Sequence, residues 1–369
     1  MRITAVELVR LELELRFPLL TSAGEHRHRP LSLVRIVTDE GVGIGECSAL
    51  EEPTYTAEYA DGAEAVLREH LIPRLLAEGR PSTLEGALAR LDPVRGHAMA
   101  KAGLEMALLD ALLKPRGESL AAFLGADRLS IPAGASVSLG HPEAVCVQVA
   151  SVVAAGYRRV KVKIAPGFDV AVLRAVRGEF PSIALSADAN GSYNLADPGH
   201  RDALVAIDDL GLMCLEQPLA AGDLVASTEL CRMLDTPVIL DESVESRSDF
   251  ENAVALGALD GVSIKPARLG GLLSARAIHD RAAALGLSCS IGGMLESGIG
   301  RATAIALGAL RGFDLPGDLG ASDRYFVPDL TTQHVLVEGE LLVPSLPGIG
   351  VTVDDELIDS LAIRRELFT

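Results

Sequence analysis

Five ionisable residues recur at intervals of about 25 positions, each at the end of a short run of apolar and β-branched residues. They are Lys163, Asp188, Glu216, Asp241 and Lys265. Three carboxylates brought close together repel one another, so such a set needs a cation beside it. Oxygen ligands select a hard divalent ion, Mg²⁺ or Mn²⁺, over zinc. The pattern therefore predicts a metal site at Asp188, Glu216 and Asp241, and the alternative is that each carboxylate caps a following helix.

Three lysines are expected to flank this metal site. Lys161 and Lys163 are two residues apart in one strand-like run, so both side chains face the same way, and Lys265 ends a run on the opposite side. Neighbouring, partly desolvated lysines are expected to have lowered pKa values and can then act as general bases. We therefore predict that Lys163 and Lys265 are catalytic, and the alternative is a structural network that neutralises the carboxylates.

This combination suits the removal of a proton next to a carboxylate group. Such a proton is weakly acidic, and its loss creates an enediolate with two negative charges. A divalent ion on the substrate carboxylate and a second cation opposite would stabilise that charge. The sequence thus predicts a Mg²⁺-dependent enzyme that acts on a small carboxylate substrate.

The segments that must position these residues alternate between strand-like runs and Ala/Leu-rich helical stretches. Such alternation is typical of βαβ units and a parallel sheet. Seven clear runs and a weak eighth favour a (β/α)₈-type, TIM-like barrel, in which chemistry sits at the carboxyl ends of the strands. An open doubly wound sheet is the alternative, but the first run lacks the Gly-rich loop usual there. The expected strands are 133–139, 159–164, 183–187, 212–215, 238–240, 261–264, 287–291 and 313–315.

The beginning and end of the chain have a different pattern. Strand-like segments at 3–15, 33–37 and 42–46, with a polar insert at 21–30, precede helical stretches from about Tyr55 to Leu124. We predict an α+β capping domain at 1–125 and a catalytic barrel at 126–325. Residues 326–369 are again strand-like and are expected to return to the capping domain.

Composition excludes several classes of protein. The 369 residues are 49% hydrophobic, which rules out wholesale disorder, and the net charge of −18 argues against a nucleic-acid partner. Five cysteines without a CxxC motif indicate a reducing cytoplasm and no thiolate zinc site. No signal-peptide pattern or membrane-crossing run is present, so we expect a cytoplasmic protein without a membrane partner.

Seven motifs together resemble the enolase superfamily, in particular its muconate-lactonizing-enzyme subgroup. Within that subgroup the chain is most similar to o-succinylbenzoate synthases and N-succinylamino acid racemases, also called N-acylamino acid racemases. A lysine base working with Mg²⁺ is already established for this superfamily. The motifs are KVKI (161–164), DAN (188–190), EQPL (216–219), DES (241–243), IKPARLGG (264–271), GGMLESG (292–298) and PGD (316–318).

The resemblance implies a modified (β/α)₇β barrel, an α+β cap completed by the C-terminal tail, and a homo-oligomer. The roles it implies are Mg²⁺ ligation by Asp188, Glu216 and Asp241 with support from Glu242, and acid–base chemistry by Lys163 and Lys265 with support from Lys161. Arg268 is expected to meet the acyl or succinyl end of the substrate, or else to begin a helix. The substrate contacts expected in all are Lys161, Asn190, Arg268, Gly292, Gly293, Met294, Ser22 and Tyr55.

Two reactions fit this family and one site. The main prediction is o-succinylbenzoate synthase, a lyase of menaquinone biosynthesis, in which Lys163 removes the proton and water leaves a cyclohexadiene acid. The alternative is racemisation of N-succinyl or N-acyl amino acids, in which both lysines exchange protons, and one protein can do both. A non-catalytic binding barrel is the third hypothesis, which a missing ligand or lysine would favour, and none is missing.

Overall fold

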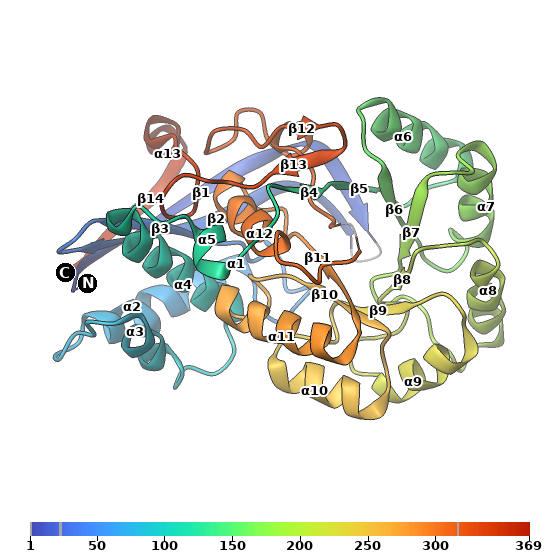
Figure 1. Cartoon of the computed structure of the whole chain (residues 1–369), viewed down its shortest axis with the longest axis horizontal. Coiled ribbons are helices and arrows are strands. Elements are labelled where there is room, and N and C mark those ends of the chain that lie inside the picture. The colour runs from blue at the N-terminus through green and yellow to red at the C-terminus, as the bar shows by residue number, and fades with distance from the viewer. Residues whose placement is uncertain (1, 22–23, 316) are drawn as a thin grey trace.

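Seven parallel strands form the centre of the larger part of the molecule, in the order β11-β10-β9-β8-β7-β6-β5 (Figure 1). The computed structural model describes residues 2–21, 24–315 and 317–369. Strands consecutive in sequence are neighbours in the sheet, and each strong predicted run overlaps one of them. The strands are β5 (Gly134–Val137), β6 (Arg159–Lys163), β7 (Ala184–Asp188), β8 (Leu215–Glu216), β9 (Val238–Leu240), β10 (Gly261–Ile264) and β11 (Ser288–Ile291).

A helix follows each of these strands and covers the outside of the curled sheet (Figure 1). Side-chain oxygens of Asp169, Asp197, Asp223, Ser246 and Ser297 accept backbone N–H bonds at the starts of five of the helices, which satisfies donors that a helix leaves free. The helices are α6 (Pro142–Ala154), α7 (Val170–Glu179), α8 (Pro198–Asp208), α9 (Leu224–Met233), α10 (Arg247–Leu256), α11 (Leu272–Leu285) and α12 (Gly298–Gly308).

An irregular segment closes the gap between β11 and β5. Leu315 N donates to Cys289 O at 3.1 Å, and Asp318 N donates to Ile291 O at 2.8 Å. On the other side Gly134 N donates to Leu319 O at 3.3 Å. The weak eighth run is thus a closing segment rather than a regular strand, and the prediction of a modified TIM-like barrel is confirmed.

A four-stranded antiparallel sheet in the order β14-β1-β2-β3 forms the centre of the capping unit. Helix α4 is buried on all sides between this sheet and the barrel, in keeping with its apolar sequence. It packs so closely on β3 that a Cβ on Gly45 would lie 2.0 Å from Gly103 O. The strands are β1 (Ile3–Thr21), β2 (Gly24–Thr38), β3 (Val42–Cys47) and β14 (Ala362–Phe368). The helices are α1 (Ala60–Val66), η1 (Leu67–Leu71), α2 (Ile72–Leu76), α3 (Leu84–Leu91), α4 (Ala98–Leu113), η2 (Lys114–Arg116) and α5 (Leu120–Leu124).

The polar insert predicted at 21–30 is strand from Gly24 onward. Residues from Gly24 onward belong to β2 and pair with the end of β1, for example Leu19 with His26. From Gly24 onward the segment is therefore part of a long strand. Its polar residues are compatible with a strand because residues 24–28 are exposed or only partly buried.

The C-terminal residues contact both units. Strand β14 pairs with β1, for example Phe368 with Val6. The domain boundaries themselves stay predictions. Across the described ranges, no helix combines the length and apolar character needed to cross a membrane. The remaining elements are β4 (Ser130–Pro132), β12 (Leu336–Val337), β13 (Glu340–Leu342), η3 (Ser322–Arg324) and α13 (Asp355–Leu361).

Candidate active site

Strand register brings the first three of the five recurring residues side by side. Lys163 on β6 is aligned with Asp188 on β7, and Asp188 is aligned with Glu216 on β8. Lys163 Nζ donates to Asp188 Oδ2 at 2.7 Å and to Asn190 Oδ1 at 2.9 Å. Because parallel strands present their carboxyl ends at one rim, residues far apart in the sequence meet there.

Lys161 lies below this rim and binds three carboxylates at once. Its Nζ is 3.0 Å from Asp188 Oδ2, 3.1 Å from Glu216 Oε2 and 2.8 Å from Asp318 Oδ2. Burial works to lower the pKa of Lys161, but Asp318, Glu216 and Asp188 outweigh burial and raise it well above its usual value. The expectation of a lowered pKa is therefore wrong for Lys161, because carboxylates rather than other lysines are its nearest neighbours.

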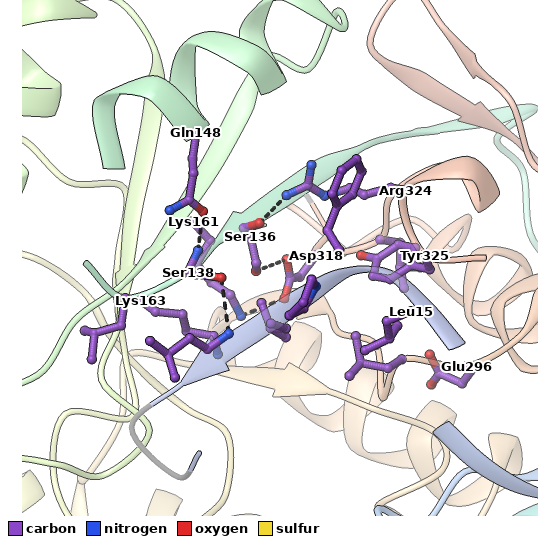
Figure 2. Close-up of a pocket in the computed structure, with 18 of the residues that line it drawn as sticks. Leu15, Ser136, Ser138, Gln148, Lys161, Lys163, Glu296, Asp318, Arg324 and Tyr325 are labelled. Carbon is purple, nitrogen blue, oxygen red and sulfur yellow. Dashed lines mark hydrogen bonds and ion pairs between the residues drawn. The ribbon is translucent and has the colours of Figure 1, made fainter. Parts of the chain in front are cut away.

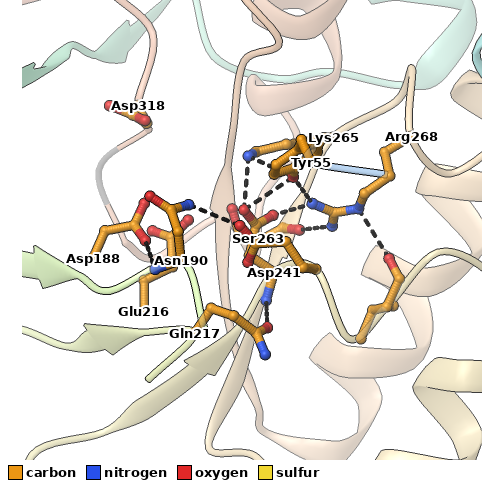
Figure 3. A network of polar contacts seen from close by, with 12 residues as sticks. Tyr55, Asp188, Asn190, Glu216, Gln217, Asp241, Ser263, Lys265, Arg268 and Asp318 are labelled. Carbon is orange, nitrogen blue, oxygen red and sulfur yellow. Dashed lines mark hydrogen bonds and ion pairs between the residues drawn. The ribbon is translucent and has the colours of Figure 1, made fainter. Parts of the chain in front are cut away.

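Lys265 stands in a separate network with Asp241, Tyr55 and Arg268 (Figure 3). Its Nζ donates to Asp241 Oδ2 at 2.8 Å and to the Tyr55 hydroxyl at 2.9 Å. Tyr55 donates in turn to Asp241 Oδ2 at 3.0 Å. Burial works to lower the pKa of Lys265, but Asp241 and Tyr55 raise it above its usual value, so the predicted lowering is wrong here too.

Arg268 supports this network from behind. Its Nη1 forms an ion pair with Asp241 Oδ1 and donates to the Tyr55 hydroxyl at 2.7 Å. Nε donates to Val244 O at 3.0 Å, and Nη2 to Ser263 O at 2.8 Å. All three nitrogens are engaged, the residue is 1% exposed, and it is not among the described residues that line the two main cavities. In this geometry the guanidinium holds Asp241 and Tyr55 and is turned away from the cavities, and its contact with the acyl end of the substrate stays a prediction.

The carboxylates are a chemically suitable set for a hard cation. Burial works to raise the pKa of Asp188, but Lys163 and Lys161 hold it below the usual value. Burial acts in the same way on Asp241, and there Arg268 and Lys265 hold the pKa below the usual value. Burial raises the pKa of Glu216, and its carboxylate neighbours add to that rise. As the side chains stand, no three His, Cys, Asp or Glu residues in the described ranges are grouped closely enough to hold a metal ion. The ammonium groups of Lys161 and Lys265 are bonded to these carboxylates instead.

Glu242 indicates independently that a positive charge is missing beside these carboxylates. Its Oε1 accepts from Asn190 Nδ2 at 2.7 Å, whereas its buried Oε2 has no hydrogen-bond partner among the described residues. Burial, together with Asp241 and Asp188, raises the pKa of Glu242 to about 8. A buried, unsatisfied carboxylate oxygen beside two other carboxylates is the environment that a divalent cation neutralises. The donor set therefore fits the predicted ion.

Two cavities meet at Lys163 and Lys265. The larger has a volume of about 590 Å³ and also reaches Lys161, and the smaller, of about 270 Å³, is lined by Tyr55, Asn190 and Met294 among others. Both volumes are lined in part by Leu19, Lys163, Lys265, Gly293 and Leu295. The two lysines thus face a space large enough for a substrate.

Gly292 and Ser22 complete the predicted set. A Cβ on Gly292 would lie 2.7 Å from Lys265 Cε, so glycine leaves the room that this lysine needs. Ser22 lies outside the described residues.

Sequence reasoning missed three residues at the site. Asp318 binds Lys161. A signal for it was present in the sequence, because Asp318 is a charged residue just after the weak eighth run, as the other site residues are at the ends of their runs. His26, which lies within the polar insert, lines the smaller cavity. Arg29 is fully buried and donates to backbone oxygens of Ser48, Ala49, Met294 and Leu295, for which no local sequence signal exists.

Comparisons with known proteins show the family to which the chain belongs. Residues 3–125 match the mandelate racemase / muconate lactonizing enzyme N-terminal domain, and residues 144–357 match the enolase C-terminal domain-like family. The chain is 44% identical to an N-succinylamino acid racemase from Amycolatopsis sp, over 99% of both chains. It is 42% identical to an o-succinylbenzoate synthase from Geobacillus stearothermophilus, over 98% of this chain and 96% of that one. A solved enolase-superfamily protein from Listeria innocua covers 100% of this chain and 99% of its own, with a TM-score of 0.94 and 37% identity. The chain belongs to the enolase superfamily, in the group that includes o-succinylbenzoate synthases and N-succinylamino acid racemases.

Proposed function

We propose that this protein is an o-succinylbenzoate synthase, which removes the proton next to a carboxylate and releases water from a cyclohexadiene acid. The observation that carries the proposal is the pair of buried lysines, Lys163 and Lys265, that face the same cavities beside the strand-end carboxylates. Relatives named o-succinylbenzoate synthase are 37–42% identical to this chain over most of its length.

In this proposal Lys163 takes the proton. Asp188 and Asn190 hold its amino group at the rim, 2.7 and 2.9 Å away, so the nitrogen is oriented before substrate arrives. Holding a base in a single geometry lowers the barrier because no reorganisation is needed during the reaction. Lys265, fixed by Asp241 and Tyr55, remains protonated and supplies a cation on the other side.

Asp188, Glu216 and Asp241 would hold Mg²⁺, or Mn²⁺, and Glu242 would support them. The bound ion supplies a positive charge that stabilises the negative charge developing on the substrate carboxylate. Lys161, which now binds Asp188 and Glu216, would keep that end of the site positive near the substrate. Leucine side chains from the capping hairpin, among them Leu19, help keep water away from the lysines.

A second activity is supported by the same arrangement. Both lysines face the cavity space, and racemisation needs one proton carrier on each side of the reacting carbon. Relatives named N-succinylamino acid racemase are 44% and 39% identical to this chain. We therefore propose that N-succinyl or N-acyl amino acids are alternative substrates of the same site.

We place the enzyme in the cytoplasm, in keeping with its five free cysteines. Its partner is a small carboxylate substrate, and assembly as a homo-oligomer stays a prediction.

A panel of two assays tests the function. Purified protein with Mg²⁺ is given the cyclohexadiene acid, and the ultraviolet absorbance of the aromatic product is followed. Separately, deuterium exchange from solvent into each enantiomer of N-succinyl amino acids is measured by NMR. We expect product formation that stops on chelation and returns with Mg²⁺. Absence of both product and exchange in the Mg²⁺-loaded protein would contradict the proposal.

A further inference from the structure

The larger cavity continues beyond the lysines to a wall made by β5, α6 and η3. Figure 2 shows Lys161 and Lys163 on one side of this space and Arg324 and Tyr325 on the other. A volume of about 590 Å³ exceeds what the reacting carboxylate and its neighbouring carbon need. The far wall is therefore placed to bind another part of the substrate.

Arg324 on this wall carries a charge that the protein leaves unpaired. Its Nη2 donates to the carbonyl oxygen of Ser136, and its guanidinium carbon lies 5.8 Å from the ring centroid of Tyr157. These contacts orient the group, yet it forms no ion pair with any carboxylate in the described part of the chain. Lys161, Lys163 and Lys265, which line the same cavity, all pair with carboxylates. Arg301 also lines this cavity and forms no ion pair among the described residues, but it is buried, and its Nη1 and Nη2 donate to Gly320 O at 2.8 Å and to Glu296 O at 2.7 Å. Arg324 is only partly buried and, within the described ranges, donates through Nη2 alone, so it is the cavity cation with the most donors left for an anion.

Two neighbouring side chains add donors on the same wall. Gln148 Oε1 accepts from Ser138 N at 2.9 Å, which turns the amide so that its NH₂ group remains available to a ligand. The Ser138 hydroxyl oxygen accepts from Leu20 N at 3.2 Å, so its own hydrogen can be donated. The wall therefore offers a guanidinium, an amide and a hydroxyl.

The two carboxylates that line this cavity, Asp318 and Glu296, do not neutralise these donors. Asp318 already binds Lys161 at 2.8 Å and accepts from Ser136 Oγ at 2.7 Å. Glu296 forms no ion pair with Arg324 in the described residues and is drawn away from it in Figure 2.

We propose that Arg324, together with Gln148 and Ser138, binds a second carboxylate of the substrate at the end far from the reacting carbon. The inference rests on the proposed function, because the synthase and the racemase reactions both involve a succinyl group, which ends in a carboxylate. Guanidinium–carboxylate hydrogen bonds are among the strongest in proteins and select for that anion. The subsite would make this enzyme specific for dicarboxylates and would discriminate against acyl groups that end in a methyl.

Binding of two matched acids tests the subsite without turnover. The probes are o-succinylbenzoate and 2-butanoylbenzoate, which has the same carbon skeleton with a methyl in place of the distal carboxylate. Calorimetry with Mg²⁺ present is applied to the wild type, Arg324→Gln, Arg324→Lys and the control Arg311→Gln, whose side chain is exposed and paired with Asp127. We expect the wild type and the control to prefer the succinyl acid by about 10- to 100-fold. Arg324→Gln should lose most of that preference, and Arg324→Lys should retain part of it.

The outcomes separate the subsite from the function. Equal weakening of both acids in Arg324→Gln would indicate a structural role and overturn the inference, as would an unchanged preference. Turnover by a wild type that shows no preference for the succinyl acid would overturn the subsite alone. Binding of neither acid by the wild type would overturn the subsite, and absent activity in the two assays would overturn the function as well.

Discussion

The two lysines of the site are held in different ways. Within the described residues, Lys163 is bonded only to residues of the barrel, Asp188 and Asn190 on the neighbouring strand end. Lys265 is enclosed by barrel residues and by Tyr55 of the capping unit, whose ring centroid lies 4.8 Å from its Nζ. The comparison teaches that strand register alone positions one lysine, whereas the docking of two units positions the other.

The capping unit also holds the segment that follows Lys265. Glu105 of α4 accepts from Leu273 N at 3.0 Å at the start of α11, so a side chain of one unit caps a helix of the other. A Cβ on Gly271 would lie 2.5 Å from the Glu105 carboxylate, so glycine is required at this contact. Contacts from both units thus hold the Lys265 side of the site in place.

The largest loss of turnover is expected from replacing Lys163, the lysine that barrel residues alone hold. Lys163→Ala should reduce synthase turnover by about 1000-fold or more, because the other amine on that side, Lys161, is bound by three carboxylates that raise its pKa and keep it protonated. Circular dichroism and Mg²⁺ titration should show that folding and metal binding are retained. Lys163→Arg is the matched variant, since it keeps the charge beside Asp188 but cannot serve as a base. Substantial turnover in either variant would remove Lys163 from its role.

The next effect concerns the carboxylate on the Lys265 side. Asp241→Asn should weaken Mg²⁺ binding by about 100-fold, because a proposed ligand is lost and the buried Lys265 and Arg268 lose their shared counter-charge. Calorimetric titration with Mg²⁺ measures the change. Asp314→Asn is the control, since Asp314 accepts from Cys289 N away from the three ligands. An unchanged titration in Asp241→Asn would argue against the proposed ligand set.

A smaller change would sharpen the contrast between the two lysines. Tyr55→Phe removes one hydroxyl that bonds Lys265, Arg268 and Asp241, and should slow proton exchange by about tenfold. The loss should fall on the enantiomer whose proton Lys265 carries, and deuterium exchange into each enantiomer measures it. Tyr59→Phe, at an exposed tyrosine, is the control. Equal slowing of both enantiomers would contradict a role confined to the Lys265 side.

The last effect concerns stability and not catalysis: a change in the free energy of unfolding with pH at the contact between the units. Burial raises the pKa of Glu105 to about 7 from its ordinary value of 4.5. An acid with a raised folded-state pKa contributes stability below pH 4.5, and that stability is lost as pH rises through 7. Glu105→Gln should remove this dependence, worth about 3 kcal/mol between pH 4.5 and 8.

Urea unfolding at several pH values measures this dependence. Glu85→Gln, at an exposed position near the start of α3, should behave like the wild type. The same pH slope in Glu105→Gln as in the wild type would show that the carboxyl does not titrate in this way.

The sequence by itself determined the barrel and the group of residues at its rim. Apolar runs that end in Lys163, Asp188 and Glu216 recur at intervals of about 25 residues. Parallel strands align their carboxyl ends whatever the details of packing. The eighth run was weak in the sequence because its segment closes the barrel through single backbone contacts instead of a strand ladder.

Only the tertiary structure decided what surrounds those residues. Tyr55 meets Asp241 across 186 positions, and Arg29 meets Leu295 across 266, without any periodic pattern that links them. Arg268 forms an ion pair with the buried Asp241, whereas Arg324 bonds a backbone oxygen and keeps donors for a ligand. Nothing in the local sequence around the two arginines predicts this difference. These side-chain contacts depend on which surfaces of the two units pack together. Their free energy is set by residues that are far away in the chain.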